Sequence, residues 1–217
     1  MSFDITMALA NSKKGSFAHP LLSDERAILT QPYGGKWYHA AKQGRLFTGN
    51  AAAAGVTIPI YSNTAQVFGL WNPANSDVLG VLVNLAMTYV SGTAAAGGYC
   101  LGLLRDVGAL AGTAAPISAF TKGTPERGRL GGKTGGNTIQ FTPSACTVTT
   151  GLMVIARQLG LNVQALTAAD ATCPGWTWVR EFDGDLVLEP GNALFLCGNI
   201  AVGSVWAPSL TWAEEPI

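Results

Sequence analysis

The C-terminal stretch, residues 176–217, constrains the fold most, because short apolar segments alternate there with turn-forming dipeptides. Asp183-Gly184 and Pro190-Gly191 favour tight turns, since glycine accepts a positive φ and the proline ring fixes its own φ at the value that the turn requires. Between turns, runs such as Trp176-Thr177-Trp178-Val179 alternate in character, as in a strand with one buried face. An apolar segment also reaches Trp212, where an unpaired chain end would fray. The stretch predicts antiparallel β-structure that includes the C-terminus, with a hairpin at Asp183-Gly184 and a type II turn at Pro190-Gly191.

The same period of two recurs upstream. Strand-like runs separated by turn formers cover residues 44–49, 56–60, 66–71, 99–104, 138–141 and 148–156. Residues 78–90 form the longest apolar run, and its glycine and valines favour a buried core strand over a helix. A single helix is expected around residues 163–171, and residues 106–136 are expected to be rich in loops. So many short strands with turns at this spacing predict an all-β fold, an antiparallel β-sandwich that is jelly-roll-like.

Residues 1–40 differ from the rest of the chain. They gather charged and polar residues, both histidines (His19 and His39), and prolines at positions 20 and 32. Proline is excluded from central strands and restrains the residue before it. The sequence therefore predicts an extended N-terminal arm, residues 1–40, with a short strand at 27–30, followed by a sandwich domain, residues 41–217. A disordered leader is the alternative for the arm.

The chain carries little charge. It has 13 Lys and Arg against 13 Asp and Glu, and charged residues make up only 12% of it, about half of the usual ~25%. Because charge keeps proteins soluble and apart, this composition favours a protein that associates; a neutral secreted domain covered by Ser, Thr and Asn is the alternative. Zero net charge disfavours a nucleic-acid partner. No secretory signal or membrane-spanning run is recognised, so we expect folding in a cytoplasm and no membrane partner.

The four cysteines, Cys100, Cys146, Cys173 and Cys197, lie far apart and form no Cys-x-x-Cys pair. This spacing excludes the usual structural zinc site. Buried free thiols that act as small apolar residues are the expected state, with disulfides as the alternative.

Three short motifs resemble binding or catalytic sites, but each lacks residues that the site requires. Gly132-Lys133-Thr134 looks like the end of a phosphate-binding loop, but the required earlier glycine is replaced by Arg127 and a strand-like segment follows. Asp183-Gly184-Asp185 lacks the further ligands of a calcium loop. No Gly-x-Ser-x-Gly elbow accompanies the two histidines.

A glycosidase would need a pair of carboxylates. The candidates are Glu181, Glu189, Glu214 and Glu215, which polar strand positions and an exposed tail explain more simply. We therefore expect no catalytic residue, no cofactor and no metal ligand, and we do not expect an enzyme.

Six tryptophans remain to be explained. Trp37 and Trp71 lie near turns and are the best candidates for stacking on a sugar ring. The others alternate within strands, which predicts core or subunit-interface positions. The residues singled out as interface candidates are Trp37, Trp71, Trp206 and Trp212.

Several segments together resemble virion structural proteins of tailed bacteriophages, and most of all the small jelly-roll-like proteins that decorate or cement capsids. These segments are Trp37-Tyr38, Gly49-Asn50 with the alanine run after it, Leu70-Trp71-Asn72-Pro73, and the ending from Pro190-Gly191 to Glu215. The resemblance covers roughly residues 35–217 and carries over no functional residue. It implies homotrimers at local threefold positions of a capsid, where they bridge subunits of the major capsid protein.

The expected function is therefore structural: decoration or cementing of a phage capsid, at the capsid surface of a virion assembled in the host cytoplasm. A receptor- or carbohydrate-binding module of a phage tail or fibre is the alternative, and it rests on the tryptophans.

Overall fold

The computed structural model describes residues 35–92, 97–105, 117–128, 135–149, 153–163, 177–201 and 203–217. The chain divides into two compact units, residues 1–38 and 39–217. The predicted arm lies outside the described residues up to residue 34, as does its expected strand at 27–30. The helix expected at 163–171 also lies outside them, except for Val163, which ends a strand.

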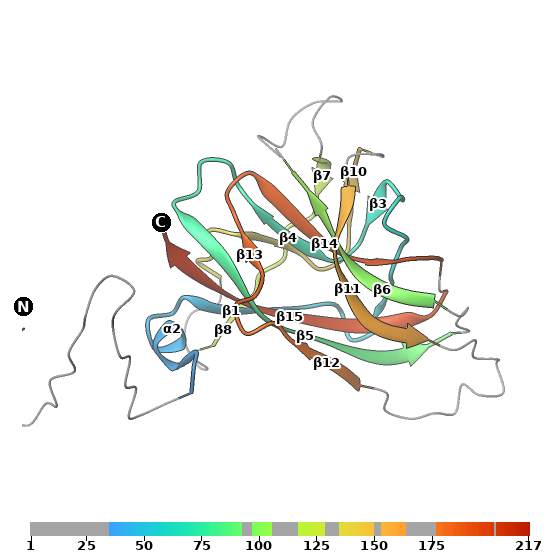
Figure 1. Cartoon of the computed structure of the whole chain (residues 1–217), viewed down its shortest axis with the longest axis horizontal. Coiled ribbons are helices and arrows are strands. Elements are labelled where there is room, and N and C mark those ends of the chain that lie inside the picture. The colour runs from blue at the N-terminus through green and yellow to red at the C-terminus, as the bar shows by residue number, and fades with distance from the viewer. Residues whose placement is uncertain are drawn as a thin grey trace, which may run out of the picture. The chain divides into compact units, whose positions relative to one another are not determined.

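Strands make up nearly all of the described secondary structure, which confirms the all-β prediction (Figure 1). The strands are β1 (Leu46–Asn50), β2 (Val56–Thr57), β3 (Ala65–Gln66), β4 (Gly69–Asn72), β5 (Val78–Ser91), β6 (Gly97–Leu104), β7 (Ile117–Phe120), β8 (Glu126–Arg127), β9 (Gln140–Thr142), β10 (Cys146–Val148), β11 (Met153–Val163), β12 (Thr177–Glu181), β13 (Val187–Leu188), β14 (Asn192–Gly198) and β15 (Val205–Pro216). One short helix, α2 (Tyr38–Lys42), precedes them and was not predicted. Its single turn is too short to show a helical period in the sequence.

The strands form three sheets. The β15 sheet has the order β12-β5-β15-β1-β8, with β13 also on β5 and β2 also on β15. The β14 sheet has the order β11-β6-β14-β4-β9, and the small sheet has the order β3-β10-β7. Without the short added strands, β12-β5-β15-β1 and β11-β6-β14-β4 have the strand order of a jelly roll, in which the first and last strands are neighbours. The jelly-roll-like prediction is therefore confirmed in its connectivity.

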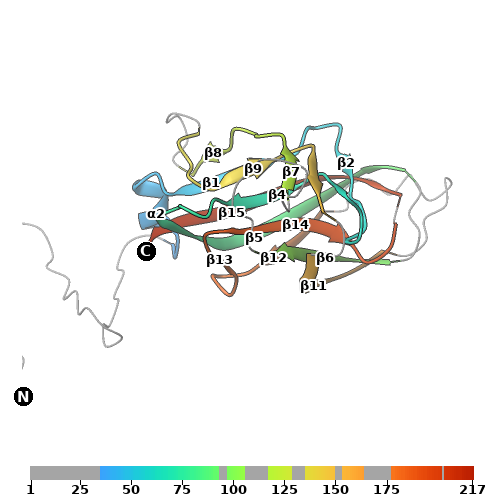
Figure 2. The same ribbon diagram turned by 90° about the horizontal axis from the view of Figure 1, so that it is seen from above.

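The long connection between β6 and β11 adds strands to this frame. It places β8 beside β1 and β9 beside β4, so each main sheet gains a short edge strand on the same side of the sandwich. Figure 2 shows β8 and β9 along one side and β11, β12 and β13 along the other. The same connection supplies β7 and β10, so the loop-rich prediction for residues 106–136 missed β7 and β8. Both strands are short, and their partners lie far away in the sequence, which leaves no local signal.

The main core lies between the two large sheets and is rich in aromatic rings. Trp212 stacks on Phe47 with ring centroids 5.8 Å apart. Trp206 lies between Tyr89 and Tyr99, each at 5.6 Å in an edge-on arrangement. Such pairs add about 0.5–1.5 kcal/mol each beyond the burial of their apolar surface.

The C-terminal strand lies in the middle of its sheet, as the ordered ending predicted. β15 pairs with β5 along its whole length and with β1 from Ser209 to Ala213. Pro208 lies within this strand, opposite Met87 of β5, although proline normally avoids central strands. The carbonyl of Pro208 accepts a hydrogen bond from the Ala51 N–H at 2.9 Å, so its nitrogen faces the gap between β1 and β2, where no ladder partner is required. The proline is tolerated for this reason.

A second core lies on the outer face of the β14 sheet, beneath the small sheet. Its buried members are Trp71, Cys100, Leu104, Ile117, Cys146, Val148, Met153, Ala193, Phe195 and Cys197. We call this outer face of the β14 sheet the covered face. It explains why β14 is buried at almost every position instead of alternating.

The Asp183-Gly184 hairpin prediction is wrong, although a tight turn is present. Asp183 and Gly184 have φ of 53° and 91°, and the Asp185 N–H donates to the Phe182 carbonyl at 2.8 Å. However, β12 and β13 both run antiparallel to β5, so the chain continues in the same direction after the turn. The turn is a bulge in an edge strand, because the long β5 provides hydrogen-bond partners on both sides of it.

Other boundaries also differ from the sequence prediction. Pro190-Gly191 forms the expected turn, and Gly191 has the positive φ, 79°, that a type II turn requires. It connects β13 in one sheet to β14 in the other. The strand expected at 56–60 is shorter, and the one expected at 148–156 is divided between β10 and β11.

Candidate functional site

Three of the four tryptophans predicted at an interface lie inside the sandwich unit. Trp206 and Trp212 are 1% and 0% exposed in the main core. Trp71 is buried in the second core, with its ring centroid 6.0 Å from that of Phe120. These side chains point inward because they occupy the core-facing positions of their strands, so the structure places them away from any surface that a partner or a sugar could contact. Trp37 is half-buried in the other unit, with the Lys36 ammonium 5.4 Å from its ring centre.

Glu214 is also buried, so the exposed-tail explanation is wrong for this residue. Its carboxylate accepts hydrogen bonds from the Thr138 N–H at 3.0 Å and the Ile139 N–H at 2.9 Å. Hydrogen bonds to a charged acceptor are stronger than neutral ones. Glu214 therefore fixes the segment that leads into β9.

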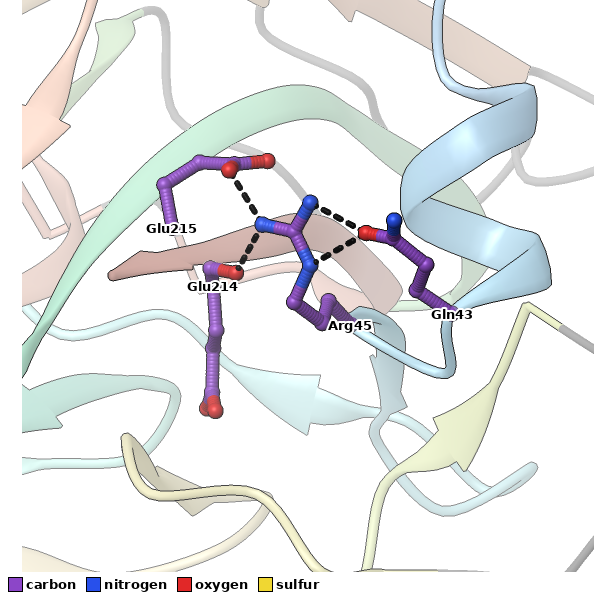
Figure 3. A network of polar contacts seen from close by, with 4 residues as sticks. All are labelled: Gln43, Arg45, Glu214 and Glu215. Carbon is purple, nitrogen blue, oxygen red and sulfur yellow. Dashed lines mark hydrogen bonds and ion pairs between the residues drawn. The ribbon is translucent and has the colours of Figure 1, made fainter. Parts of the chain in front are cut away.

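A polar network joins the two ends of the sandwich unit (Figure 3). The Arg45 guanidinium donates to the Glu214 carbonyl at 3.0 Å, forms an ion pair with Glu215, and donates through Nε to the Gln43 side chain at 2.9 Å. The Glu214 N–H in turn donates to the Arg45 carbonyl at 2.8 Å. These bonds hold the last residues of β15 against the residues that lead into β1. The role of this network is therefore structural.

The buried thiols match the expected state. Cys100, Cys146 and Cys197 are free and buried, while Cys173 lies outside the described residues. Burial raises the pKa of Cys100 to about 11 and that of Cys146 to about 12. Burial also raises the pKa of Cys197, and the neighbouring Cys100 adds to this effect. All three thiols are therefore neutral near pH 7 and unsuited to nucleophilic chemistry.

Within the described ranges, no group of three or more His, Cys, Asp or Glu side chains is placed to hold a metal ion. None of the helices described is long and apolar enough to cross a membrane. A hollow of about 420 Å³ lies where β6 ends beside β13; it is lined by Leu103, Arg105, Val187, Leu188, Glu189, Pro190 and Asn192. Its charged residues, Arg105 and Glu189, form no arrangement that implies a reaction.

The most distinctive surface is the outer face of the β15 sheet, which we call the open face. Its residues alternate with core residues along β1, β5, β12 and β15, and each is half-buried or exposed. They are Thr48, Asn50, Asn84, Ala86, Thr88, Val90, Thr177, Val179, Glu181, Ala207, Ser209 and Thr211. Only one of them, Glu181 on the edge strand β12, carries a charge; a second carboxylate, Glu126, lies opposite Thr48 on the added strand β8 at the other edge.

Strand register places these small side chains side by side in rows. Asn50, Ser209, Ala86 and Val179 face one another across β1, β15, β5 and β12. In neighbouring rows, the hydroxyls of Thr48 and Thr211 are 3.1 Å apart, and those of Thr88 and Thr177 are 3.2 Å apart. Short side chains that bond to their neighbours keep this face flat.

A flat surface almost without charge suits contact with another protein. The centre of an interface is depleted of charged residues, since each charge must lose its water on binding. This surface was not predicted from the sequence, because the interface candidates were chosen among the large residues of β15. The same alternation also shows Ala207, Ser209 and Thr211 on the opposite face, so the pattern itself contained the signal.

Comparison with known proteins produced no relationship: no protein-family model, no curated protein and no solved structure matches the chain.

Proposed function

We propose that this chain is a structural virion protein that decorates or cements a bacteriophage capsid by bridging capsid subunits, and that the open face contacts the shell. The observation that carries the proposal is a flat face with almost no charge, four strands wide, on a jelly roll. The jelly roll is a fold that viral capsid proteins share with lectins. The sequence resemblance described above supports the same class.

The size of the open face bears on how such a protein would bind. With strands ~4.8 Å apart and ~6.8 Å between successive residues on one face, the open-face residues named above cover roughly 400 Å² per copy. A stable interface buries about 800 Å² on each partner. One copy would therefore bind weakly through this face alone, and strength would come from many copies on a repeating shell.

The alternative, a receptor- or carbohydrate-binding module of a tail or fibre, loses one of its two best stacking residues because Trp71 is buried. It keeps Trp37 in the other unit. A glycan array would favour this alternative if it gave binding that Trp37→Ala removes.

Co-sedimentation with empty capsid shells of the source phage tests the proposal. We expect the purified protein to pellet with the shells, and Ser209→Lys, in the middle of the open face, to abolish pelleting. The matched control is Ser144→Lys, an equally polar change at an exposed position between β9 and β10. Native mass measurement of the free protein tests the threefold contact, which requires a copy number divisible by three.

Two outcomes would contradict the proposal. If the wild-type protein stays in the supernatant with expanded and unexpanded shells, it is not a decoration protein. If Ser209→Lys pellets as well as Ser144→Lys, the open face is not the contact surface.

A further inference from the structure

The free edge of β12 carries backbone groups with no described partner strand. β12 ends the β15 sheet, and the Phe182 N–H, just after it, donates to the Val83 carbonyl at 2.9 Å. Backbone polar groups of successive residues in a strand point to opposite sides. The N–H and C=O groups of Thr177, Val179 and Glu181 therefore point away from β5.

β12 is the longest uninterrupted free edge in the described part of the chain. It has five residues in unbroken register with β5. The other edge strands are shorter: β2, β3, β8 and β13 have two residues, β9 has three and β7 has four. β11 is longer, but its register shifts at two places, which breaks the row of free groups.

We propose that β12 pairs antiparallel with β12 of a second copy of this chain, about a twofold axis that passes beside Val179. In this register Val179 faces Val179 of the second copy, and Thr177 faces Glu181 of the second copy. Each of these facing pairs exchanges both of its backbone hydrogen bonds. Trp178 faces Arg180 of the second copy in the closer, non-hydrogen-bonded pair.

The facing side chains suit one another in this register. The Arg180 guanidinium lies against the half-buried Trp178 ring, which is a favourable cation–π pair. The Thr177 hydroxyl donates to the Glu181 carboxylate, and the two valines contact each other. Moving the axis to Arg180 would place two arginines opposite each other, and like charges directly opposite are destabilising.

The turn after β12 limits the contact to one pair of strands. The bulge at Asp183-Gly184 ends the regular edge at Glu181, so a third chain finds no continuing edge. Because the same edge is used on both copies, the contact closes as a twofold pair and does not grow into a fibre. Pairing also joins the two open faces into one wider sheet surface.

This inference concerns the free protein and does not rest on shell binding. It is also distinct from the threefold contact that the resemblance implies. A twofold contact through β12 gives assemblies with an even number of copies, whether or not a threefold contact forms as well.

Val179→Pro tests the contact directly. The N–H of Val179 points to the free edge, so proline there removes cross-copy hydrogen bonds and leaves the ladder to β5 intact. Val179→Thr is the matched control, because it keeps both the N–H and the branched side chain. By sedimentation velocity we expect the wild type and Val179→Thr to have an even number of copies, and Val179→Pro to have half that mass.

A second variant keeps the proposal testable if proline perturbs the fold. Arg180→Glu places a carboxylate against Trp178 of the second copy, and we expect it to weaken self-association at least tenfold, with Arg180→Lys in between. Circular dichroism checks that each variant is folded. A wild-type protein with an odd number of copies, or folded Val179→Pro and Arg180→Glu variants with wild-type mass, would overturn the proposal.

Discussion

The two outer faces of the sandwich are built on similar four-stranded frames, but one is buried beneath a further sheet and the other is exposed. The covered face of the β14 sheet carries Phe195, Cys100 and Cys197, all fully buried under the small sheet. The open face of the β15 sheet carries Thr, Ser, Ala and Asn, which no described residue buries completely. The difference arises because the small sheet, whose strands β7 and β10 come from the long connection between β6 and β11, packs on one outer face and not on the other.

The residue pattern of the two central strands reflects this difference. β14 is buried at nearly every position, since it packs on both faces. β15 alternates for most of its length, with Trp206, Leu210 and Trp212 inward and smaller residues outward. A strand that is apolar on both faces therefore predicts that a second layer covers its sheet. A strand that alternates predicts that one face of its sheet is exposed.

The largest expected effect is on the covered face. Phe195→Ala removes a ring that is 0% exposed in the second core, so it should lower the free energy of unfolding by about 3–5 kcal/mol. Thr211→Ala, on the open face, should lower it by only about 1 kcal/mol or less, through the lost hydroxyl contact with Thr48. Urea unfolding followed by tryptophan fluorescence measures both. Similar values for the two variants would mean that the faces do not differ in packing.

A smaller effect, in the second core that lies between the covered face and the small sheet, concerns pH. Burial raises the pKa of the Cys146 thiol in the folded protein to about 12, from an ordinary value of 9.0. As the pH rises, the thiol of the unfolded chain therefore loses its proton before that of the folded protein. The stabilisation is complete below pH 9 and falls as the pH rises toward 12. One pKa unit corresponds to about 1.4 kcal/mol. Between pH 9 and pH 11, the free energy of unfolding of the wild type should therefore fall by about 2 kcal/mol more than that of Cys146→Ala. Parallel curves for the two proteins would refute the buried neutral thiol.

The smallest expected effect is a charge on the open face. Ser209→Lys should change the free energy of unfolding by about 0.5 kcal/mol or less, because its ammonium stays in water. Ala193→Lys, on the fully buried covered face, should prevent cooperative unfolding, since the charge has no partner there. Thermal melts of the two variants would make this comparison. A severe loss in Ser209→Lys would show that the open face is buried in the free protein.

Much of the fold could be predicted from the sequence, and the candidate site could not. The alternation of residues 206–212 and the Pro190-Gly191 turn are local patterns, and both were predicted correctly. The interface candidates were chosen for size, and Trp71, Trp206 and Trp212 proved to be buried because large rings contribute most when they leave water. The surface that we propose for contact consists instead of small residues from four strands that are neighbours only after folding.

The sequence by itself determined the all-β class, the ordered C-terminal strand and the buried state of the described thiols. These follow from periodicity and turn chemistry, which act over a few residues. Only the tertiary structure decided that Asp183-Gly184 is a bulge, that Glu214 is buried, that one face is covered, and that β12 has no second partner strand among the described residues. Each depends on pairing between segments far apart in the chain, such as β12 with β5 or β8 with β1. A period of two in the sequence shows that a segment is a strand. The strands that pair with it and the layers that pack on it decide which of its edges and faces remain exposed.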